Sequence, residues 1–473
     1  MTTTVGASSM PWLSELYALA QETLDRNVVT DDAGTFIRAG GGYADPWTRD
    51  AALNSWGAAT LLRPDDARAT LLRVCEPAPD GRLVVAQDDQ WWDQIIWVIA
   101  ACDHAWTTGD DEFLATAWHV GRDSLEILHR DRFRPRWGLY AGPGLMQDGI
   151  SGLPTPPATA DEPTSFVLDY PDAHEIMTLS TNVVYGAALR CLAEAADRLG
   201  HDVAALAARA DALAAAIEEH LRDGDTYGYF LHGTGPQAGT LDRHREAAGL
   251  ALAVVVGLVP ADRTREVLDS IGRGPAGVVN VAPHFDRYDD AHPGRHNAIC
   301  WPMVMGLAGL ASATAGDRAG VVRTLEDFYR VVDAGGGRFD ELYDAATGLA
   351  HGGWQCGHVW PSQPDQTWSA TSLLRLVHLG LVGLAPSADG LRFAPLPLEA
   401  DETIELRGLP YGAATLDITL RGATDRVADQ IDGQVDTRNI VLVDGADVSD
   451  DAVHVPVGAA GTHQVDVLVG AAG

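Results

Sequence analysis

Lysine is absent from this chain of 473 residues, so arginine supplies all 33 of its basic side chains. Aspartate and glutamate together number 66, which gives a formal net charge of −33 at pH 7. So negative a chain repels nucleic acids and anionic membranes, because both carry dense negative charge. The charge balance therefore argues against a polyanionic partner. We interpret the missing lysine as the signature of a GC-rich genome.

Long apolar runs and organised cysteines are also missing. No uninterrupted apolar stretch is long enough to span a bilayer, and residues 1–12 have neither the basic nor the apolar part of a secretory signal. The five cysteines are scattered, odd in number and lack CxxC spacing, which indicates reduced and mostly buried side chains and not a metal site. The sequence thus predicts a cytoplasmic protein with no membrane partner.

Apolar periodicity predicts a helical chain up to about residue 382. Residues 203–221 repeat apolar side chains every three or four positions and keep one polar face, whereas residues 91–106 and 298–313 are apolar nearly all round. This alternation of amphipathic and enclosed helices is typical of an (α/α)6 barrel, an all-α fold. The twelve predicted helices span residues 12–25, 49–62, 64–74, 90–107, 111–130, 180–198, 201–222, 243–256, 261–271, 296–314, 317–333 and 366–382.

The connections between these helices alternate in length. Short links of a few residues alternate with long ones, and in an alternating barrel all the long links lie at one end. Loops of such length inside a compact domain usually carry function. We therefore expect the pocket at the long-loop end, with the N-termini of the inner helices pointing into it. The long links are residues 27–48, 75–89, 131–179, 223–242, 272–295 and 334–365.

The chain changes character after Leu384. Residues 391–393, 415–420, 439–443 and 464–469 read as strands, punctuated by glycine, aspartate and proline. The sequence therefore predicts a small β-sandwich-like domain over residues 384–473, next to a barrel domain over residues 1–383. The absence of aromatic clusters from the β region argues against an independent sugar-binding module.

The long loops and the starts of the enclosed helices concentrate carboxylates, amides, arginines and tryptophans. Neutral sugars need this mixture, because polar groups bind their hydroxyls and aromatic faces pack on the C–H side of the ring. We therefore predict a small-molecule sugar as the partner, with no cofactor and no metal. The predicted substrate-binding residues are Trp47, Arg49, Asp50, Gln87, Asp88, Trp91, Trp92, Asp93, Asn182, Arg243, His244, His296, Asn297, Trp301, Tyr343, Trp354, Gln355, Gln366 and Trp368.

Several motifs in these loops are those of one group of enzymes. The chain resembles the six-hairpin glycosidases, especially glycoside hydrolase family 63 and its bacterial mannosylglycerate/glucosylglycerate hydrolase relatives. The resemblance covers nearly all of the predicted barrel and the small C-terminal domain. The motifs that carry it are Trp47-Thr-Arg-Asp50, Asp148-Gly-Ile-Ser-Gly followed by Leu179-Ser-Thr-Asn, His296-Asn297 with Trp301-Pro302, and Phe339-Asp-Glu-Leu-Tyr-Asp-Ala-Ala-Thr-Gly followed by Gln366-Thr-Trp-Ser-Ala.

The resemblance implies a role for each of two carboxylates. Asp148 would be the general acid, with Asp50 as the next candidate, and Glu341 would be the general base, with Asp340 as its nearest substitute. The element that begins at Trp47 would hold hydroxyls of the terminal sugar. The stricter relatives have a Gly-Trp-Asp type of acid motif, and this chain departs from them there.

The chemistry agrees with these roles. An inverting glycosidase places a protonated carboxyl at the leaving oxygen and a second carboxylate, about 6.5–9.5 Å away, on a water across the ring. A neighbouring carboxylate such as Asp93, or an apolar wall such as Trp91 and Trp92, would raise the pKa of the acid. We therefore predict an exo-acting, anomer-inverting hydrolase of a small α-linked glucoside or related oligosaccharide.

Other functions stay open at this point. A phosphorylase of similar architecture would replace water by phosphate, for which Arg243, Arg245 and Arg295 are candidates if they do not serve as ion-pair partners. A sugar epimerase would use paired histidines, and a silent sugar-binding barrel would use none of these groups chemically. His244 and His296 lack the HExxH or comparable spacing of a metal site. Nothing in the sequence indicates an oligomeric state.

Overall fold

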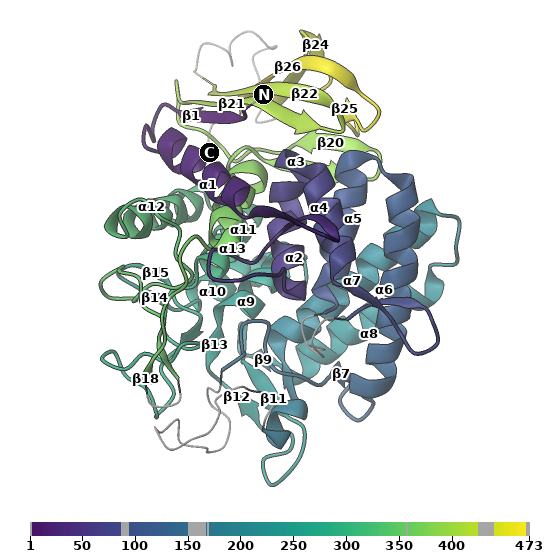
Figure 1. Ribbon diagram of the computed structural model, residues 1–473, viewed down its shortest axis with the longest axis vertical. Coiled ribbons are helices and arrows are strands. Elements are labelled where there is room, and N and C mark those ends of the chain that lie inside the picture. Colours follow the sequence, from purple (N-terminus) through teal and green to yellow (C-terminus); the bar gives the residue numbers. More distant parts are fainter. Residues whose placement is uncertain are drawn as a thin grey trace.

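The computed structural model describes residues 2–86, 94–149, 167, 170–355, 358–423 and 439–469. Helices form the body of the molecule, with the longer strands gathered against one end of it, at the top of Figure 1. Loops and short hairpins lie at the opposite end. No helix among the described residues has the length and apolar character needed to cross a membrane.

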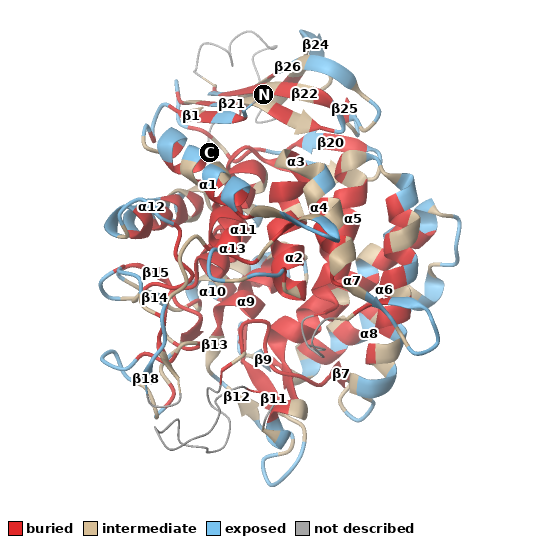
Figure 2. Cartoon of the chain, viewed as in Figure 1, coloured by how far each residue is buried: buried red, intermediate tan, exposed pale blue. Residues whose placement is uncertain are grey.

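Six helices contact one another in succession, from α2 to α5, α7, α9, α11 and α13 and back to α2. Most of their residues are buried, because neighbouring helices surround them, and α7 is exposed only toward its C-terminal end (Figure 2). This explains why these sequences are apolar nearly all round. The bounds are α2 Thr48–Asn54, α5 Ile96–Thr108, α7 Leu179–Arg198, α9 Ala247–Val255, α11 Pro302–Thr314 and α13 Thr367–Arg375.

Six further helices each pack against one or two of the first set. They carry exposed residues on their outer faces, as α6, α8 and α12 show in Figure 2. Their amphipathic sequences follow from this position, with one face on the inner helices and one in water. The bounds are α1 Leu13–Arg26, α4 Pro64–Arg73, α6 Asp111–Arg132, α8 Ala204–His220, α10 Thr264–Asp269 and α12 Arg318–Ala334.

Every one of the twelve predicted stretches contains a helix, but two predicted starts are wrong. Residues 245–246 form a strand that pairs with residues 281–282, so α9 begins only at Ala247. Residues 296–301 are not helical, and α11 begins at Pro302, because proline suits the first helical position and disfavours a helical residue before it. The helix predicted over 90–107 begins at Ile96, and residues 90–93 lie outside the described part of the chain.

Helix α2 is interrupted by a π-helical turn, Ser55–Ala59, before it continues as α3, Thr60–Leu62. At the break Gly57 has φ +60°, and its N–H donates to the Asp103 carboxylate at 3.0 Å. Its carbonyl accepts from His378 Nδ1 at 2.9 Å, and Arg375 Nε donates to the Trp56 carbonyl at 2.8 Å. The polar backbone groups released by the break are thus satisfied inside the protein.

The described residues also contain three shorter helical turns, one of which continues α13. They are Pro171–His174, Ala261–Arg263 and Leu376–Leu381. The long links between helices, predicted as loops, contain short antiparallel strands. Their bounds are β2 Val28–Asp31, β3 Gly34–Ile37, β4 Cys75–Pro77, β5 Leu83–Val85, β6 Phe133–Arg134, β7 Leu139–Tyr140, β8 Ile176–Thr178, β9 Arg222–Asp223, β10 Thr226–Tyr227, β11 Phe230–His232, β12 Leu241–Asp242, β13 Arg245–Glu246, β14 Arg273–Gly274, β15 Gly277–Val278, β16 Val281–Ala282, β17 Trp354–Gln355 and β18 His358–Val359.

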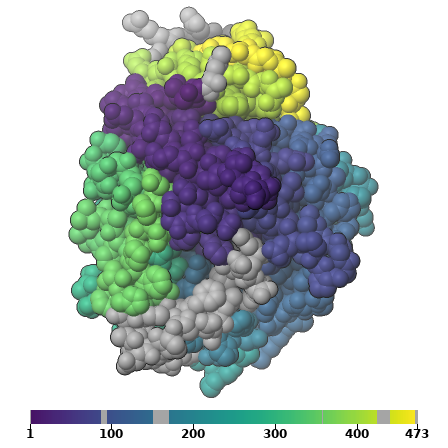
Figure 3. Space-filling model, viewed as in Figure 1, coloured from purple at the N-terminus to yellow at the C-terminus, as the bar shows by residue number. Residues whose placement is uncertain are grey.

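The segments predicted as strands after Leu384 are strands. They lie in a six-stranded sheet of order β1-β21-β22-β26-β23-β24 and a three-stranded sheet of order β19-β20-β25. The larger sheet includes an N-terminal strand that the sequence did not reveal, β1, which pairs antiparallel with β21 (Figure 3 shows the purple N-terminal region against the yellow-green strand region). The bounds are β1 Thr4–Ala7, β19 Leu384–Ser387, β20 Gly390–Phe393, β21 Thr403–Tyr411, β22 Ala413–Gly422, β23 Ile440–Val443, β24 Ala446–Asp447, β25 Val455–Pro456 and β26 Ala460–Val469.

Side-chain contacts join these strands to the helices. Glu402, directly before β21, accepts hydrogen bonds from Ser9, at 2.5 Å, and from Arg318 of α12. Strand β19 also contacts α5, and β21 contacts α3. The strands are thus anchored at several points along the helical body, on the side away from the short hairpins of the long loops.

Because of the break in α2, adding a methyl group at Gly57 should reduce the free energy of unfolding more than adding one at another glycine of positive φ. A Cβ at Gly57 would lie 2.7 Å from Leu379 Cδ1, in addition to the strain of a positive φ. Gly200 also has a positive φ, +75°, but a Cβ there meets nothing within 4 Å. We expect Gly200→Ala to lower the free energy of unfolding by about 1 kcal/mol, and Gly57→Ala to cost about 1–3 kcal/mol more through overpacking. Equal costs in urea denaturation would contradict this account of the break.

Candidate active site

One polar cavity of about 200 Å³ brings together more than half of those predicted site residues that lie in the described part of the chain. All of its lining residues except Tyr43 and Arg295 were predicted as catalytic or substrate-binding from the sequence. Three carboxylates, two arginines and three tryptophans share this space, as expected for a site that binds a neutral sugar. The lining residues are Tyr43, Trp47, Arg49, Asp50, Asp148, Arg295, His296, Trp301, Glu341, Gln366 and Trp368.

Three inner helices place their first residues in this cavity. Arg49 and Asp50 lie in the first turn of α2, Trp301 directly precedes α11, and Gln366 and Trp368 lie at the start of α13. The expected arrangement, with the N-termini of inner helices pointing into the pocket, is therefore present for α2, α11 and α13. Helix N-termini carry partial positive charge, which suits a cavity rich in carboxylates.

Glycines allow the loop before α2 to approach α13 closely. A Cβ at Gly40 would lie 2.4 Å from the side chain of Gln366, and one at Gly41 would lie 2.9 Å from the carbonyl of Pro364. Any larger residue would push these segments apart. The Gly40–Gly42 run therefore brings Tyr43 and the start of α2 against the wall formed by α13.

The backbone of the loop that carries Asp148 is held from several sides. Ser180, in the first turn of α7, accepts from the Leu145 N–H at 2.8 Å. The Met146 carbonyl accepts from Asn280 Nδ2 at 3.2 Å and from His296 Nδ1 at 3.0 Å. These bonds position Asp148 without occupying its carboxylate.

Asp148 forms a two-bond ion pair with Arg49. Arg49 Nη1 donates to Oδ1 at 2.9 Å and Nη2 donates to Oδ2 at 3.0 Å, while Nη1 also donates to the Leu145 carbonyl at 2.7 Å. About a third of the Asp148 side chain is exposed. Burial alone raises the pKa of Asp148, but the charges of Arg49, His296 and Arg295 outweigh it, so that the pKa lies below its usual value.

Glu341 is almost fully buried and accepts from three donors. Tyr43 donates its hydroxyl to Oε1 at 2.8 Å, Arg295 Nη2 donates to Oε2 at 2.7 Å, and the Gln363 N–H donates to Oε2 at 3.3 Å. Every one of these partners is a donor, which complements a carboxylate that acts as acceptor only. The contact makes Tyr43 less acidic, since burial and then the charge of Glu341 raise the pKa of its hydroxyl.

His296 is a neutral hydrogen-bonding group at neutral pH. Burial lowers its pKa to about 4, although the charge of Asp148 acts in the opposite direction. Because the Met146 carbonyl can only accept, Nδ1 carries the proton of the neutral ring and Nε2 keeps its lone pair. His296 can therefore accept a hydrogen bond through Nε2.

A buried carboxyl group that the sequence analysis missed lies beneath the Asp148 loop. Glu246, directly before α9, accepts from the Ser180 hydroxyl at 2.6 Å and from the Ser180 N–H at 3.2 Å. Burial raises its pKa to about 7, against the effect of these hydrogen bonds. The signal that could have identified Glu246 was its position directly before an inner helix. The sequence predicted that this helix begins at residue 243, which placed Glu246 inside the helix instead of at its start.

Several other predicted residues lie outside the cavity lining. Asn182 holds Tyr140 through bonds to its N–H, at 2.7 Å, and its carbonyl, at 3.0 Å. Arg243 pairs with Asp223 at 3.0 Å, and His244 contacts Asp242 at 2.8 Å. A role in substrate binding for these three residues stays a prediction.

The remaining predicted residues divide into two groups. Tyr343 uses its hydroxyl to bind the backbone of Asp340 and Arg338, at 2.7 and 3.1 Å. Asn297 is buried but does not line the cavity. Trp354 and Gln355 form strand β17 and are half-buried. The others lie outside the described residues, namely Gln87, Asp88, Trp91, Trp92 and Asp93.

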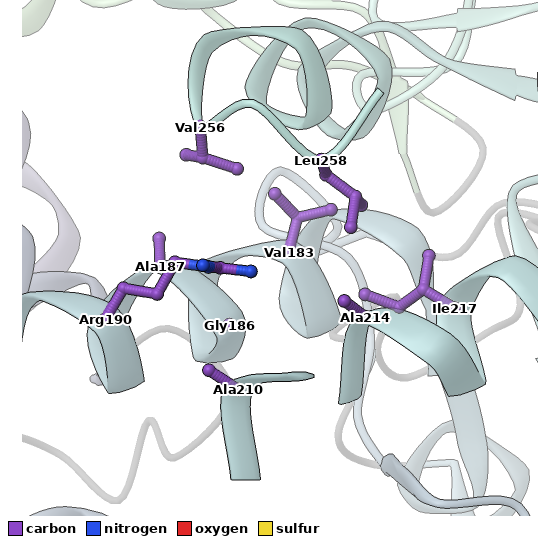
Figure 4. A pocket seen from close by; sticks show the side chains of 9 residues that line it. All are labelled: Val183, Gly186, Ala187, Arg190, Ala210, Ala214, Ile217, Val256 and Leu258. Atoms are coloured by element: carbon purple, nitrogen blue, oxygen red, sulfur yellow. The ribbon is translucent and has the colours of Figure 1, made fainter. Parts of the chain in front are cut away.

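Another cavity, shown in Figure 4, has a different character. It is small, about 20 Å³, and its lining is apolar except for one arginine side chain. Such a lining offers no carboxylates for acid/base chemistry. It is formed by Val183, Gly186, Ala187, Arg190, Ala210, Ala214, Ile217, Val256 and Leu258. Across the described parts of the chain, no three His, Cys, Asp or Glu side chains gather in the way that a metal ion requires.

Comparison with known families identifies one that spans the cavity. A family model described as the mannosylglycerate hydrolase MGH1-like glycoside hydrolase domain matches residues 43–369. That range contains every residue lining the cavity. A search of curated proteins found no match.

Solved structures with a similar fold are glycosidases of several kinds. A family 63 mannosylglycerate hydrolase from Thermus thermophilus, in complex with glucose, superposes with a TM-score of 0.57 at 17% identity, covering 76% of this chain and 99% of that one. A sialidase matches at 0.62 and 16% identity over 87% of this chain, which spans only 37% of the sialidase. A family 78 rhamnosidase from a Bacillus species superposes with a TM-score of 0.58 at 16% identity, covering 88% of this chain and 41% of the rhamnosidase. Such likenesses show a shared fold.

The raised pKa of Glu246 predicts a pH-dependent stability. Its pKa moves from 4.5 to about 7 on folding, so its favourable contribution is complete below about pH 4.5 and is lost as the pH rises through about 7. We expect the wild type to lose on the order of 3 kcal/mol over that window from this group. Glu246→Gln removes the titrating group, so the urea midpoint should change less with pH than in the wild type. Any loss of stability from the substitution itself should be the same at every pH.

The exposed Glu126 offers a control for the Glu246 experiment. It forms a surface pair with Arg209 and keeps more than half of its side chain in water, so Glu126→Gln should leave the slope of the profile as in the wild type. A Glu246→Gln profile as steep as the wild-type one would show that Glu246 does not titrate in this range.

Proposed function

This chain belongs to the mannosylglycerate hydrolase MGH1-like glycoside hydrolase family, and from that membership and its site we propose that it is an exo-acting, anomer-inverting hydrolase of a small α-linked glucoside or related oligosaccharide. The observation that carries the proposal is that Asp148 and Glu341, from two loops far apart in the sequence, line one small cavity. Inversion requires two such carboxyl groups on opposite sides of the anomeric carbon.

We further propose that the helical body is an (α/α)6 barrel. The contacts of the inner helices return from α13 to α2, and each inner helix has an outer neighbour. The folds of the glycosidase structures similar to this chain support the same architecture. The site then lies at the end of the barrel that carries the long loops, as the lining residues indicate.

In the proposed reaction Asp148 and Glu341 have complementary tasks. Asp148 gives its proton to the glycosidic oxygen as the bond from that oxygen to the anomeric carbon breaks. Water attacks the anomeric carbon from the opposite face, and Glu341 takes the proton that this water releases. Tyr43, Arg295 and the Gln363 N–H all donate to Glu341, and these bonds fix the orientation of its carboxylate in the cavity.

The size and lining of the cavity support cleavage of a terminal sugar. A volume of about 200 Å³ accommodates about one sugar ring. Trp301 and Trp368 lie with ring centroids 5.6 Å apart and supply an aromatic wall for the apolar side of such a ring. Asp50 and the amide of Gln366, 3.5 Å apart, offer polar groups for its hydroxyls.

A substrate screen would identify the glycoside. We would test α-linked disaccharides together with mannosylglycerate and glucosylglycerate, because one similar structure is named as a mannosylglycerate hydrolase. Assays with and without inorganic phosphate separate hydrolysis from phosphorolysis.

A cytoplasmic site of action is also proposed. The four described cysteines are free thiols, which supports a reducing compartment.

Glu341→Gln tests the base. The amide keeps the shape of the side chain but cannot take a proton, so turnover should fall by about 10²–10⁴-fold while the substrate still binds. NMR of the first product formed by the wild type should show the anomer opposite to that of the substrate. Release of the same anomer would mean a retaining mechanism with carboxyl groups about 5–5.5 Å apart, and the role given to Glu341 would be wrong.

Asp148→Asn tests the acid through the leaving group. Poor leaving groups need protonation, so their turnover should fall by about 10²–10⁴-fold. Activated aryl glycosides and glycosyl fluorides need little protonation and should be cleaved with a much smaller loss. An equal loss on both kinds of substrate, measured as kcat, would indicate that Asp148 binds the sugar and does not donate the proton.

A further inference from the structure

A conflict in the cavity concerns the proton on Asp148. As general acid, this side chain must be protonated when the glycosidic bond breaks. Both of its oxygens instead accept from the Arg49 guanidinium, at 2.9 and 3.0 Å. A two-bond contact of this kind favours a carboxylate, because a protonated carboxyl group has one oxygen that carries a proton and donates. While Arg49 stays in this place, Asp148 is held in its ionised form, which has no proton to give.

The position of Arg49 is set by the fold. Its side chain starts in the first turn of α2 and is only 5% exposed. The guanidinium also donates to the Leu145 carbonyl and lies 5.5 Å from the centre of the Trp368 ring. Arg49 nevertheless lines the same cavity as Asp148, so a bound sugar would meet both side chains.

We propose that Arg49 is a latch on the general acid, holding Asp148 ionised in the free enzyme and releasing it for protonation when a bound substrate draws the guanidinium away. This inference rests on the proposed function, in which Asp148 is the acid. The released carboxylate takes its proton from solvent and passes it to the glycosidic oxygen. Arg49 is thus a positioning residue that acts through Asp148, beyond any contact that it makes with the sugar.

The charged groups around Asp148 support the latch. Arg49 approaches it from α2, and Arg295 and His296 from the loop before α11, while Asp50 and Glu341 share the cavity. Burial keeps His296 uncharged near pH 7, because its pKa lies at about 4. Arg295 is bonded to Glu341 at 2.7 Å. Arg49 is therefore the cation bonded directly to Asp148, and moving it should raise the pKa of Asp148.

The latch predicts a difference between two pH profiles of the wild-type enzyme. The basic limb of kcat/KM reports the acid in the free enzyme, and that of kcat reports the same acid in the complex with substrate. If substrate releases Asp148, the limb of kcat lies at higher pH than the limb of kcat/KM. An arginine beside an aspartate lowers its pKa by about 1–3 units, so a separation of about that size is expected.

Two variants of Arg49 test the cause of this separation. Arg49→Met removes the charge, so both limbs should coincide at the higher pH. Arg49→Lys keeps a charge but cannot form two parallel bonds, so the limbs should remain separated by a smaller amount. An arginine that only holds a sugar hydroxyl would raise KM on substitution and leave both limbs in place. Circular dichroism and melting curves would establish that the variants fold.

The outcomes separate the latch from the proposed function. Asp148→Asn should abolish the basic limb of both profiles. If the limb persists in that variant, Asp148 is not the acid and the proposed function fails at this residue. If the basic limb disappears in Asp148→Asn but lies at the same pH for kcat and for kcat/KM in the wild type, the proposed role of Arg49 is wrong and the assignment of Asp148 as the acid stands. The wild-type comparison gives this answer even if Arg49→Met does not fold.

Discussion

The pairing of Asp148 and Glu341 with one guanidinium each is the interaction on which the rest of the site depends. Asp148 and Glu341 are brought into a small space where burial penalises charge and like charges repel. Arg49 offsets this penalty for Asp148, and Arg295 does so for Glu341. The two pairs differ in geometry, because Arg49 donates to both oxygens of Asp148, whereas Arg295 donates to one oxygen of Glu341.

The fold supplies these partners from different directions. Arg49 comes from the first turn of α2, whereas Arg295 comes from the loop that precedes α11. Buried side chains beneath the cavity complete the support, since Glu246 holds Ser180 and Ser180 holds the loop of Asp148. Strands beyond Leu384 pack on the helical body far from these loops, so their residues do not line the cavity.

Local patterns predicted much of this architecture because they depend on neighbours in sequence. The periodicity that distinguished enclosed from amphipathic helices reflects burial of one or all faces, and the helices appear where it indicated. It placed the starts of α9 and α11 too early. Arg245 and Glu246 form strand β13 in front of α9, and the apolar residues before Pro302 continue the pattern without being helical. Strand β1 is four residues long and joins β21 from the other end of the chain, so no local signal marked it.

The sequence by itself determined the helical class of the fold, the strands after Leu384 and the kinds of residues that meet at the long-loop end, including Asp148 and Glu341. It also identified Arg49, but as a group that binds sugar, and it left Arg295 as one of three arginines that could pair with an acid or bind phosphate. The three-dimensional structure was needed to show that Arg49 donates to both oxygens of Asp148 and that Tyr43 and Arg295 both donate to Glu341. These contacts join residues far apart in the chain, and they exist because the inner helices pack side by side from α2 round to α13 and bring their loops together.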